Sequence, residues 1–202
     1  MEEFNFFFTF YGLLLGLAAA EVLAGLGAFA RARPLRTLDP AAALLALLIF
    51  LVICATWLDA WTSRADFRLD FSSLAAPIGI ATAYYLAATV VLPRDEGQFG
   101  RLVAYIDERK TFLVLAMVFA EVLVKVTLIP HFERQLAVRP AVFWLWSVPF
   151  NGLIFGSWAW LWASRSRRGT MAATVALIAI YSIPYWENGA FTAAVSRAWG
   201  YQ

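Results

Sequence analysis

Long apolar runs, each about as long as a bilayer is thick, constrain this chain more than any other feature. A helix needs about 20 mostly apolar residues to cross roughly 30 Å of hydrocarbon. Six segments meet or approach that length: residues 4–30, 40–62, 71–92, 111–130, 140–163 and 170–186. None alternates apolar and polar residues with a period of two, which disfavours a β-barrel. Because every backbone N–H and C=O inside a bilayer must be paired, we expect an all-α integral membrane protein with six transmembrane helices.

The composition supports a membrane protein and excludes several other classes. Hydrophobic residues make up 62% of the 202 residues and charged residues 15%, against roughly 45–50% and about 25% in globular proteins. The net charge of +2 is spread along the chain, so we expect no nucleic-acid partner. One cysteine, Cys54, and one histidine, His131, exclude an intramolecular disulfide and most all-protein zinc sites. We expect neither a metal nor a cofactor.

The basic residues between the spans predict an orientation. Cytoplasmic loops of membrane proteins carry an excess of Lys and Arg. Ten basic residues fall in the connections on one side and five on the other, which places both termini outside a bacterial inner membrane. The ten are Arg31, Arg33, Arg36, Arg94, Arg101, Arg109, Lys110, Arg165, Arg167 and Arg168, and the five are Arg64, Arg68, Arg134, Arg139 and Arg197.

The two halves of the chain resemble each other at a shift of one hundred residues. Ala-Glu-Val-Leu at 20–23 recurs at 120–123, and Pro40-Ala41 recurs at 140–141. Ten of the forty positions from 11 to 50 are identical to their counterparts. After one inserted residue, which makes the shift 101, a longer motif recurs: Trp57-x-x-x-Trp61-x-Ser63-Arg64 matches Trp-x-x-x-Trp-x-Ser-Arg at 158–165. The pattern indicates duplication of a three-span unit, with chance similarity of two apolar sequences as the alternative.

Because three is an odd number, a duplicated three-span unit enters the membrane from the opposite face. The sequence therefore predicts two inverted-topology repeats, an arrangement common in transporters. The predicted parts are a first repeat at 1–92, a cytoplasmic amphipathic linker at 93–110, a second repeat at 111–186 and an interfacial C-terminal segment at 187–202. In the linker, Phe99, Leu102, Val103 and Ile106 recur at helical spacing, which is typical of a helix lying on the membrane surface.

Two carboxylates fall at matching positions inside the predicted spans. Glu21 lies ten residues before Arg31, about 15 Å along a helix, and Glu121 lies ten residues after Thr111. We therefore expect both near the bilayer centre, where an ionised group costs at least a few kcal/mol unless it is paired, hydrated or protonated. Lys125 follows Glu121 by one turn, on the same helical face. Together they predict a site for a proton, a small cation or an amine, or else a buried polar cluster that locks the helices together.

Two further residues are candidates for the same site. Pro149-Phe150-Asn151-Gly152 stands near the middle of the fifth span, where proline removes a backbone donor and favours a kink or break. Such a break frees carbonyls beside the Asn151 amide, as in the broken helices of transporters, although membrane helices also tolerate ordinary proline kinks. Asp59, near the outer end of the second span, is a candidate mouth of a cation path or an interfacial residue paired with Arg64.

The sequence favours one function and leaves two alternatives. We expect a small transporter or channel that binds a proton, small cation or amine at Glu21, Glu121, Lys125, Asn151 and Asp59. Its partners are the lipid bilayer and further copies of the chain, since six short helices enclose little space. An accessory membrane subunit, with the charges acting only as structural contacts, is the first alternative. An enzyme acting on lipid is the second, with Arg64, Asp66, Arg94 and Asp95 as headgroup contacts, although the chain shows no catalytic motif.

Overall fold

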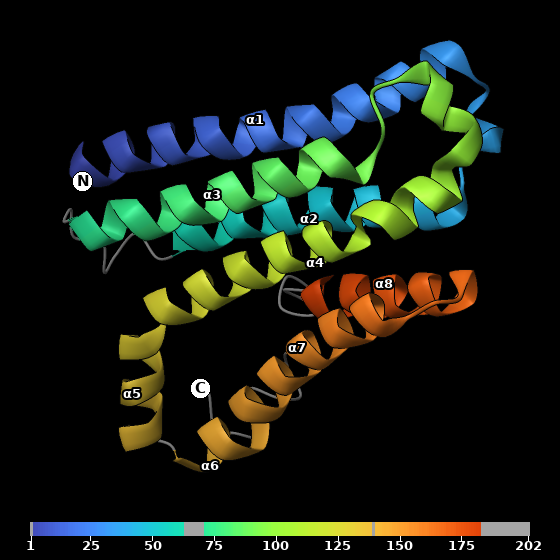
Figure 1. Cartoon of the computed structure of the whole chain (residues 1–202). Helices are drawn as coiled ribbons and strands as arrows, with labels where there is room; N and C mark the ends of the chain where they lie inside the picture. Colours follow the sequence, from blue (N-terminus) through green and yellow to red (C-terminus); the bar gives the residue numbers. More distant parts are fainter. Residues whose placement is uncertain (1, 63–70, 139, 183–202) are drawn as a thin grey trace.

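The computed structural model describes residues 2–62, 71–138 and 140–182, and within these ranges the chain is helical with no β-strand. The all-helical prediction is confirmed for this part of the chain. The helices, labelled in Figure 1, are α1 (Glu2–Ala32), α2 (Pro40–Thr62), α3 (Phe71–Val91), α4 (Leu102–Thr127), α5 (Ile129–Val138), α6 (Pro140–Val142), α7 (Val148–Ala163) and α8 (Arg167–Ser182). Between them lie the 3-10 turns η1 (Leu35–Thr37) and η3 (Glu96–Arg101) and the π-helical turn η4 (Phe143–Ser147).

The long helices α1 to α4 form the body of the bundle. α1 and α3 run in the same direction, whereas α2 and α4 run in the opposite one (Figure 1). α3 makes its most extensive contacts with α4 and α1, so it is the central helix on which both halves of the chain meet. α7 and α8 form a shorter antiparallel pair beside α4 and α2.

The core is apolar and is lined by small side chains where helices approach each other. Ala18, Ala42, Ala87 and Ala120 are fully buried, on four different helices. Small residues let membrane helices pack closely without a hydrophobic driving force between them. A single apolar cluster runs through α1, α2, α3, α4, α7 and α8, and the bundle is therefore one packed unit.

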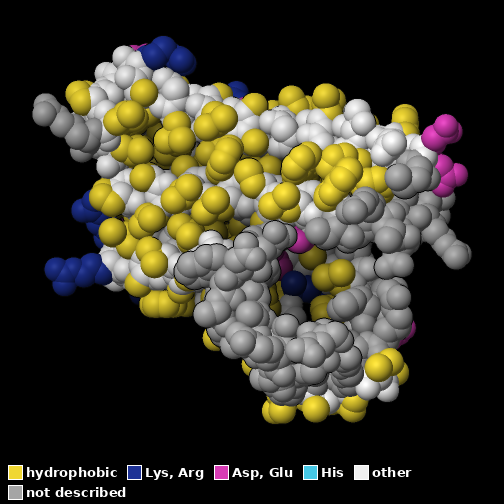
Figure 2. All heavy atoms as spheres, turned by 180° about the vertical axis from the view of Figure 1, so that it is seen from behind, with side chains coloured by type: hydrophobic (Ala, Val, Ile, Leu, Met, Phe, Trp, Pro, Cys, Tyr) yellow, Lys and Arg dark blue, Asp and Glu magenta, His cyan; other side chains and the backbone are white. Residues whose placement is uncertain are grey.

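The outer surface of the bundle is also apolar. Large hydrophobic side chains such as Phe6, Leu13, Leu47, Leu115 and Leu153 are exposed, and Figure 2 shows hydrophobic side chains spread over one face of the molecule. Three helical stretches, Glu2–Ala32, Pro40–Trp61 and Leu74–Val91, are long and apolar enough to cross a membrane. A surface of this kind is solvated by lipid tails, and the chain is a helical protein associated with a membrane.

The prediction of six spans is not confirmed. α4 has 26 residues but carries Lys110, Glu121 and Lys125 within its apolar stretch. Within the described residues α7 and α8 have 16 residues each, and neither is among the stretches found long and apolar enough to cross a membrane. Among the described residues, the structure supports membrane-crossing length and apolarity for α1, α2 and α3 alone.

The segment expected as an amphipathic linker is folded into the bundle. η3 leads directly into α4, which begins at Leu102 and continues without a break through the expected start of the fourth span at Thr111. Phe99, Leu102 and Ile106 are buried and Val103 is exposed. The ring of Phe99 meets that of Phe29 edge-on, with centroids 5.2 Å apart. Phe99 and Leu102 therefore cover the end of α1, whereas Val103 faces outward.

The second half is interrupted where proline was expected to break a helix. Regular α-helix gives way to the π-helical turn η4, and α7 begins at Val148 with Pro149 in its first turn. Proline has no N–H to donate, so the preceding turn cannot close in the α-helical pattern. The expected kink or break in the fifth span takes the form of a π-helical turn inside a continuous helical segment, and π-helical turns of this kind are frequent at functional sites.

The two halves share helix boundaries but not packing. α1 and α4 begin one hundred residues apart, as do α2 and α6. However, α3 packs most extensively on α4 of the other half and on α1, whereas α8 packs on α2 of the other half and on α7. The short helix α5 further separates α4 from α7 (Figure 1). The inverted repeat is therefore not confirmed by the way the helices contact one another.

Candidate functional site

The clearest polar group in the apolar interior is the carboxylate of Glu121 on α4, which is only 4% exposed. Its Oε1 atom accepts a hydrogen bond from the Tyr181 hydroxyl on α8. Its Oε2 atom lies 3.6 Å from the Lys125 ammonium. The fully buried Trp158 of α7 donates from Nε1 to the Tyr181 hydroxyl oxygen at 3.2 Å. We call Glu121, Lys125, Tyr181 and Trp158 the Glu121 cluster.

Three helices converge to build this cluster. The i, i+4 spacing on α4 places the ammonium beside the carboxylate, and α7 and α8 supply the two aromatic side chains from the other side. A buried carboxylate needs hydrogen-bond donors or an opposite charge to offset its desolvation. The cluster provides one of each, so that both carboxylate oxygens have a partner.

A second group of polar side chains continues from the cluster toward the ends of α2 and α4. Tyr84 of α3 is 1% exposed, and its hydroxyl forms a 3.1 Å hydrogen bond with the Thr56 hydroxyl of α2. Tyr84 lies within electrostatic range of Glu121 on one side and of Tyr11 and Asp59 on the other. Tyr11 of α1 is itself buried and within range of Asp59. We call Tyr84, Thr56, Tyr11 and Asp59 the tyrosine track.

Glu21 has a different environment from Glu121. Its carboxylate pairs with the guanidinium of Arg94, which follows α3 and whose side chain is 65% exposed. This hydrogen bond raises the pKa of the Arg94 guanidinium, which therefore stays charged. We call these two residues the Glu21 pair. The structure does not bring the two carboxylates together, since each belongs to a set with its own partners.

Contacts with α3 also place the two carboxylates at different levels. Gly25, one turn after the first carboxylate, faces the C-terminal end of α3, where an added Cβ would lie 3.0 Å from Leu92 Cβ. Leu123, two residues after the second carboxylate, instead reaches Gly79 in the first half of α3. Because α1 and α4 run in opposite directions (Figure 1), the levels of the carboxylates differ by about 10 Å at 1.5 Å per residue.

The remaining predicted residues have separate positions. Asn151 uses its amide nitrogen within its own helix, donating to the Ser147 carbonyl at 2.7 Å, beside the π-helical turn as expected. Its buried Oδ1 atom has no hydrogen-bond partner among the described residues. Asp59 is an exposed residue near the end of α2 and belongs to the tyrosine track. Arg64, the partner considered for it, lies outside the described residues, as do Asp66 and the segment 187–202.

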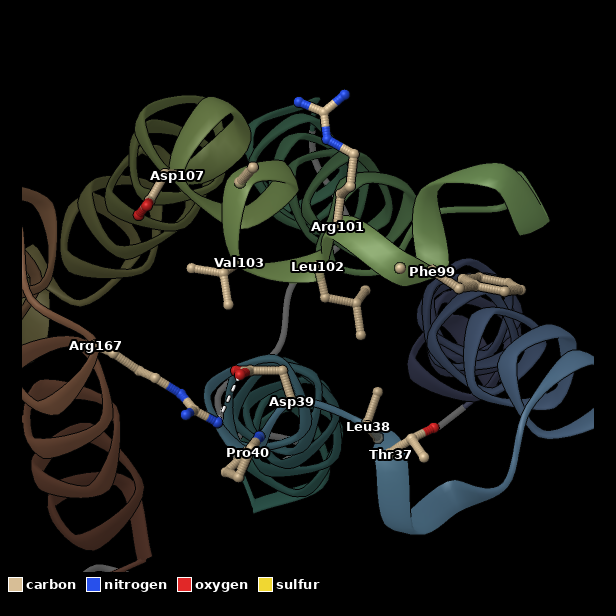
Figure 3. A pocket seen from close by; sticks show the side chains of 12 residues that line it. Thr37, Leu38, Asp39, Pro40, Phe99, Arg101, Leu102, Val103, Asp107 and Arg167 are labelled. Carbon is tan, nitrogen blue, oxygen red and sulfur yellow. Dashed lines mark ion pairs between the residues drawn. The ribbon is translucent and has the colours of Figure 1, made fainter.

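A pocket of about 700 Å³ lies at the other end of the bundle, where the starts of α2, α4 and α8 meet. Figure 3 shows Asp39 facing Arg167 across it, with Oδ2 and Nη2 2.7 Å apart. Asp39 also caps α2, accepting from the Ala41 N–H at 2.8 Å. Asp107 and Val103 line the opposite side, and Arg101 points away from the ion pair (Figure 3). The Asp39 carboxylate and the Arg167 guanidinium, which face each other across the pocket, are therefore paired with each other.

Two other charged residues act as helix caps. Lys110 is buried and donates from Nζ to the carbonyl of Ser164, the C-terminal cap of α7. A cation there satisfies the unpaired carbonyls of the helix end. Asp95, expected as a headgroup contact, caps η3 by accepting from the Gly97 N–H at 3.0 Å. With Arg94 engaged by Glu21, two of the four residues proposed for lipid chemistry have partners inside the protein.

Sequence reasoning missed the aromatic part of the Glu121 cluster. Tyr181 was not among the predicted site residues, and Trp158 was considered only as part of the repeated Trp motif, whereas in the structure both contribute polar atoms next to Glu121. A tyrosine inside an apolar span signals a buried partner, because its hydroxyl must be satisfied there. Asp39 was also missed, although Asp followed by Pro at the start of an apolar run is a recognisable helix N-terminus.

No family model, curated protein or solved structure matches the chain. The functional argument therefore depends on the geometry of the Glu121 cluster.

Proposed function

We propose that the protein is a small membrane transporter or channel that moves a proton, a small cation or an amine by way of the Glu121 cluster. The observation that carries the proposal is the burial of an ionisable carboxylate, 4% exposed, inside an apolar bundle. An ionisable group inside a membrane is energetically costly. Such groups are rare and mark ion pathways or proton relays. Glu121 is the binding residue, and Lys125 balances its charge.

The proposed architecture is six membrane-crossing helices in two inverted halves. Its support is the common helix starts at Glu2 and Leu102 and at Pro40 and Pro140, together with the opposite running directions of α1 and α4 (Figure 1). The excess of Lys and Arg at one end supports a cytoplasmic position for the pocket of Asp39 and Arg167. In this orientation the tyrosine track opens to the outside of a bacterial inner membrane, and we propose that copies of the chain associate there.

The rival function is an accessory membrane subunit. The pairing of Glu21 with Arg94 and the capping of α7 by Lys110 favour it, because these charged groups hold the bundle together and face no ligand. In that case the Glu121 cluster has the same purely structural role. The two functions differ in one measurable property: a transporter moves solute across a sealed bilayer and an accessory subunit does not.

Flux into proteoliposomes decides between them. Purified protein is reconstituted, and uptake of protons, Na⁺, K⁺ and methylammonium is followed separately. We expect flux of at least one species in the wild type and its loss in Glu121→Gln. The matched control is Glu108→Gln, the same change at an exposed position of the same helix, which should retain flux. Unchanged flux in Glu121→Gln with a lowered melting temperature identifies the cluster as structural and refutes the proposal.

A further inference from the structure

The geometry points to the proton as the species bound at Glu121, with Tyr181 as the residue that positions the carboxylate. This inference rests on the proposed transport function and narrows its substrate. Both carboxylate oxygens of Glu121 have a partner: Oε1 accepts from the Tyr181 hydroxyl, and Oε2 lies 3.6 Å from the Lys125 ammonium. Any species bound there must share an oxygen that already has a partner.

A metal cation fits this arrangement poorly. Small hard cations take about six or more oxygen ligands or keep several waters. Among the described residues, no group of three His, Cys, Asp or Glu side chains lies close enough to hold a metal ion. The Lys125 ammonium lies 3.6 Å from Oε2 of Glu121. A metal cation bound to this carboxylate would lie close to that ammonium, and two positive charges repel strongly in an apolar interior.

An amine fits poorly for a related reason. Lys125 already supplies an ammonium group to the same carboxylate. The carboxylate is buried, and its other oxygen accepts from Tyr181, whose hydroxyl accepts in turn from the fully buried Trp158. An organic cation must displace Lys125 or Tyr181 to reach either oxygen. A proton needs no such space, because it adds to an oxygen already in place.

Proton binding is a balanced step in this cluster. A hydronium ion gives up a proton, which forms an O–H bond at Oε2 of Glu121, and a water molecule remains; the reverse step breaks the same O–H bond and returns the proton to water. The cluster changes from neutral, with one carboxylate and one ammonium, to a charge of plus one. Protonation therefore removes the attraction that holds Lys125, whose side chain is 25% exposed. The ammonium is then free to turn toward the end of α4, two residues away.

The tyrosine track provides the neighbouring groups for proton exchange. Tyr84 of α3 is the group that interacts electrostatically with Glu121, and Tyr11 of α1 and Asp59 of α2 interact in turn with Tyr84. Hydroxyl groups donate and accept hydrogen bonds at once, so they can pass a proton without holding a charge. Thr56, bonded to the Tyr84 hydroxyl, is a further member of this kind. The track ends at Asp59, which is exposed.

The test combines ion flux with chemical labelling of the full chain in proteoliposomes. We expect an imposed pH gradient to drive proton uptake in the wild type and in Glu108→Gln but not in Glu121→Gln. Proton uptake should be insensitive to Na⁺, K⁺ and methylammonium. Flux of one of those cations that requires Glu121, without proton flux, overturns the inference and leaves the transport function standing. Absence of flux for every species overturns both.

Labelling provides a measurement on the unaltered protein, in case Glu121→Gln does not fold. Dicyclohexylcarbodiimide reacts with protonated carboxyl groups in apolar surroundings, and mass spectrometry locates the adduct. We expect labelling at Glu121 that increases as the pH falls. If Glu121 stays unlabelled across the pH range in which the protein remains folded, the carboxylate does not bind a proton and the inference is wrong.

Tyr181→Phe tests the positioning role. Loss of one donor to the carboxylate should lower proton flux by about tenfold, roughly the factor that one hydrogen bond supplies. It should also change the pH profile of labelling at Glu121, because the carboxylate loses one of its two partners. Tyr105→Phe, at a half-buried position of α4, is the control. A loss of flux in Tyr181→Phe with an unmoved labelling profile refutes the positioning role.

Discussion

Glu21 and Glu121 occupy the same place in two copies of Ala-Glu-Val-Leu, yet the fold gives them opposite surroundings. The first pairs with an exposed arginine at the end of α3, and the second is enclosed by α7 and α8. Equivalent sequence positions therefore do not imply equivalent chemistry. What differs is the set of helices packed on each one, and only the buried carboxylate has the properties of a membrane binding site.

The tryptophans of the repeated motif show the same divergence. Trp57 of α2 is exposed, and its ring packs on Phe8 of α1 with centroids 5.1 Å apart. Its counterpart Trp158 is fully buried and donates a hydrogen bond to Tyr181. In the second half α8 packs extensively on α7, whereas in the first half α3 contacts α2 less extensively. Four pairs of substitutions test how far this divergence of the two halves extends.

The largest effect is expected from Glu121→Ala. It leaves the partly buried Lys125 without its counter-charge and the Tyr181 hydroxyl without its acceptor, which should cost about 2–4 kcal/mol of unfolding free energy. Glu21→Ala leaves only an exposed guanidinium, which water solvates, and should cost a small fraction of that. Thermal melting in detergent measures both. Equal losses of stability would mean that the two carboxylates are equivalent after all.

Trp158→Phe should have the second largest effect. It removes the donor to Tyr181 and leaves a gap in a fully buried site, at a cost of about 1–3 kcal/mol. Trp160→Phe, two residues along the same helix but 49% exposed, should change stability by no more than about 0.5 kcal/mol. Melting curves of the two variants side by side provide the measurement. A neutral Trp158→Phe contradicts the assignment of this residue to the Glu121 cluster.

Gly25→Ala sharpens the comparison at the position that matches Lys125. A Cβ at Gly25 would lie 3.0 Å from Leu92 Cβ, so α1 and α3 must separate slightly, at a cost of about 1–2 kcal/mol. At Gly16 an added Cβ meets nothing within 4 Å, and Gly16→Ala should be neutral or slightly stabilising. Chemical denaturation in detergent compares the two. The close contact explains why the first half has no room for a lysine there.

The smallest effect concerns the far end of the bundle, where Asp39 both caps α2 and pairs with Arg167. Asp39→Ala removes both interactions and should cost about 1 kcal/mol. Asp39→Asn keeps a good cap and loses only the ion pair with a half-exposed arginine, so its cost should be well below that. The melting temperatures of Asp39→Ala and Asp39→Asn, each compared with the wild type, separate the contribution of the cap from that of the ion pair. Equal losses would assign the whole effect to the ion pair.

Much of the fold is predictable from local pattern. Apolar runs predict α1, α2 and α3 because a stretch that is apolar on all sides forms a helix in lipid irrespective of its neighbours. Pro149 predicts the interruption before α7 because the missing donor is a property of the residue itself. The i, i+4 pair of Glu121 and Lys125 is likewise set by helix geometry. These predictions are confirmed because each depends on residues within one helix.

Contacts between helices could not be predicted in the same way from local sequence pattern. The amphipathic stripe that includes Phe99 and Leu102 identifies an apolar face but does not distinguish lipid from protein as its partner, and these two residues pack on the end of α1. Matching positions of two glutamates likewise do not reveal which helices surround each one. The inward orientation of Tyr181 follows from the contact of α8 with α4, which no local pattern encodes.

The amino-acid sequence alone determines that this chain is helical, that it associates with a membrane and that Glu121 has Lys125 on its own helix, because helix periodicity and apolar length act locally. Tertiary structure decides that Glu121 is buried and Glu21 is not. It also decides that Tyr181 and Trp158 complete the buried cluster. The physical reason is that burial and hydrogen bonding between helices depend on which surfaces meet, and packing, not sequence repetition, selects those surfaces.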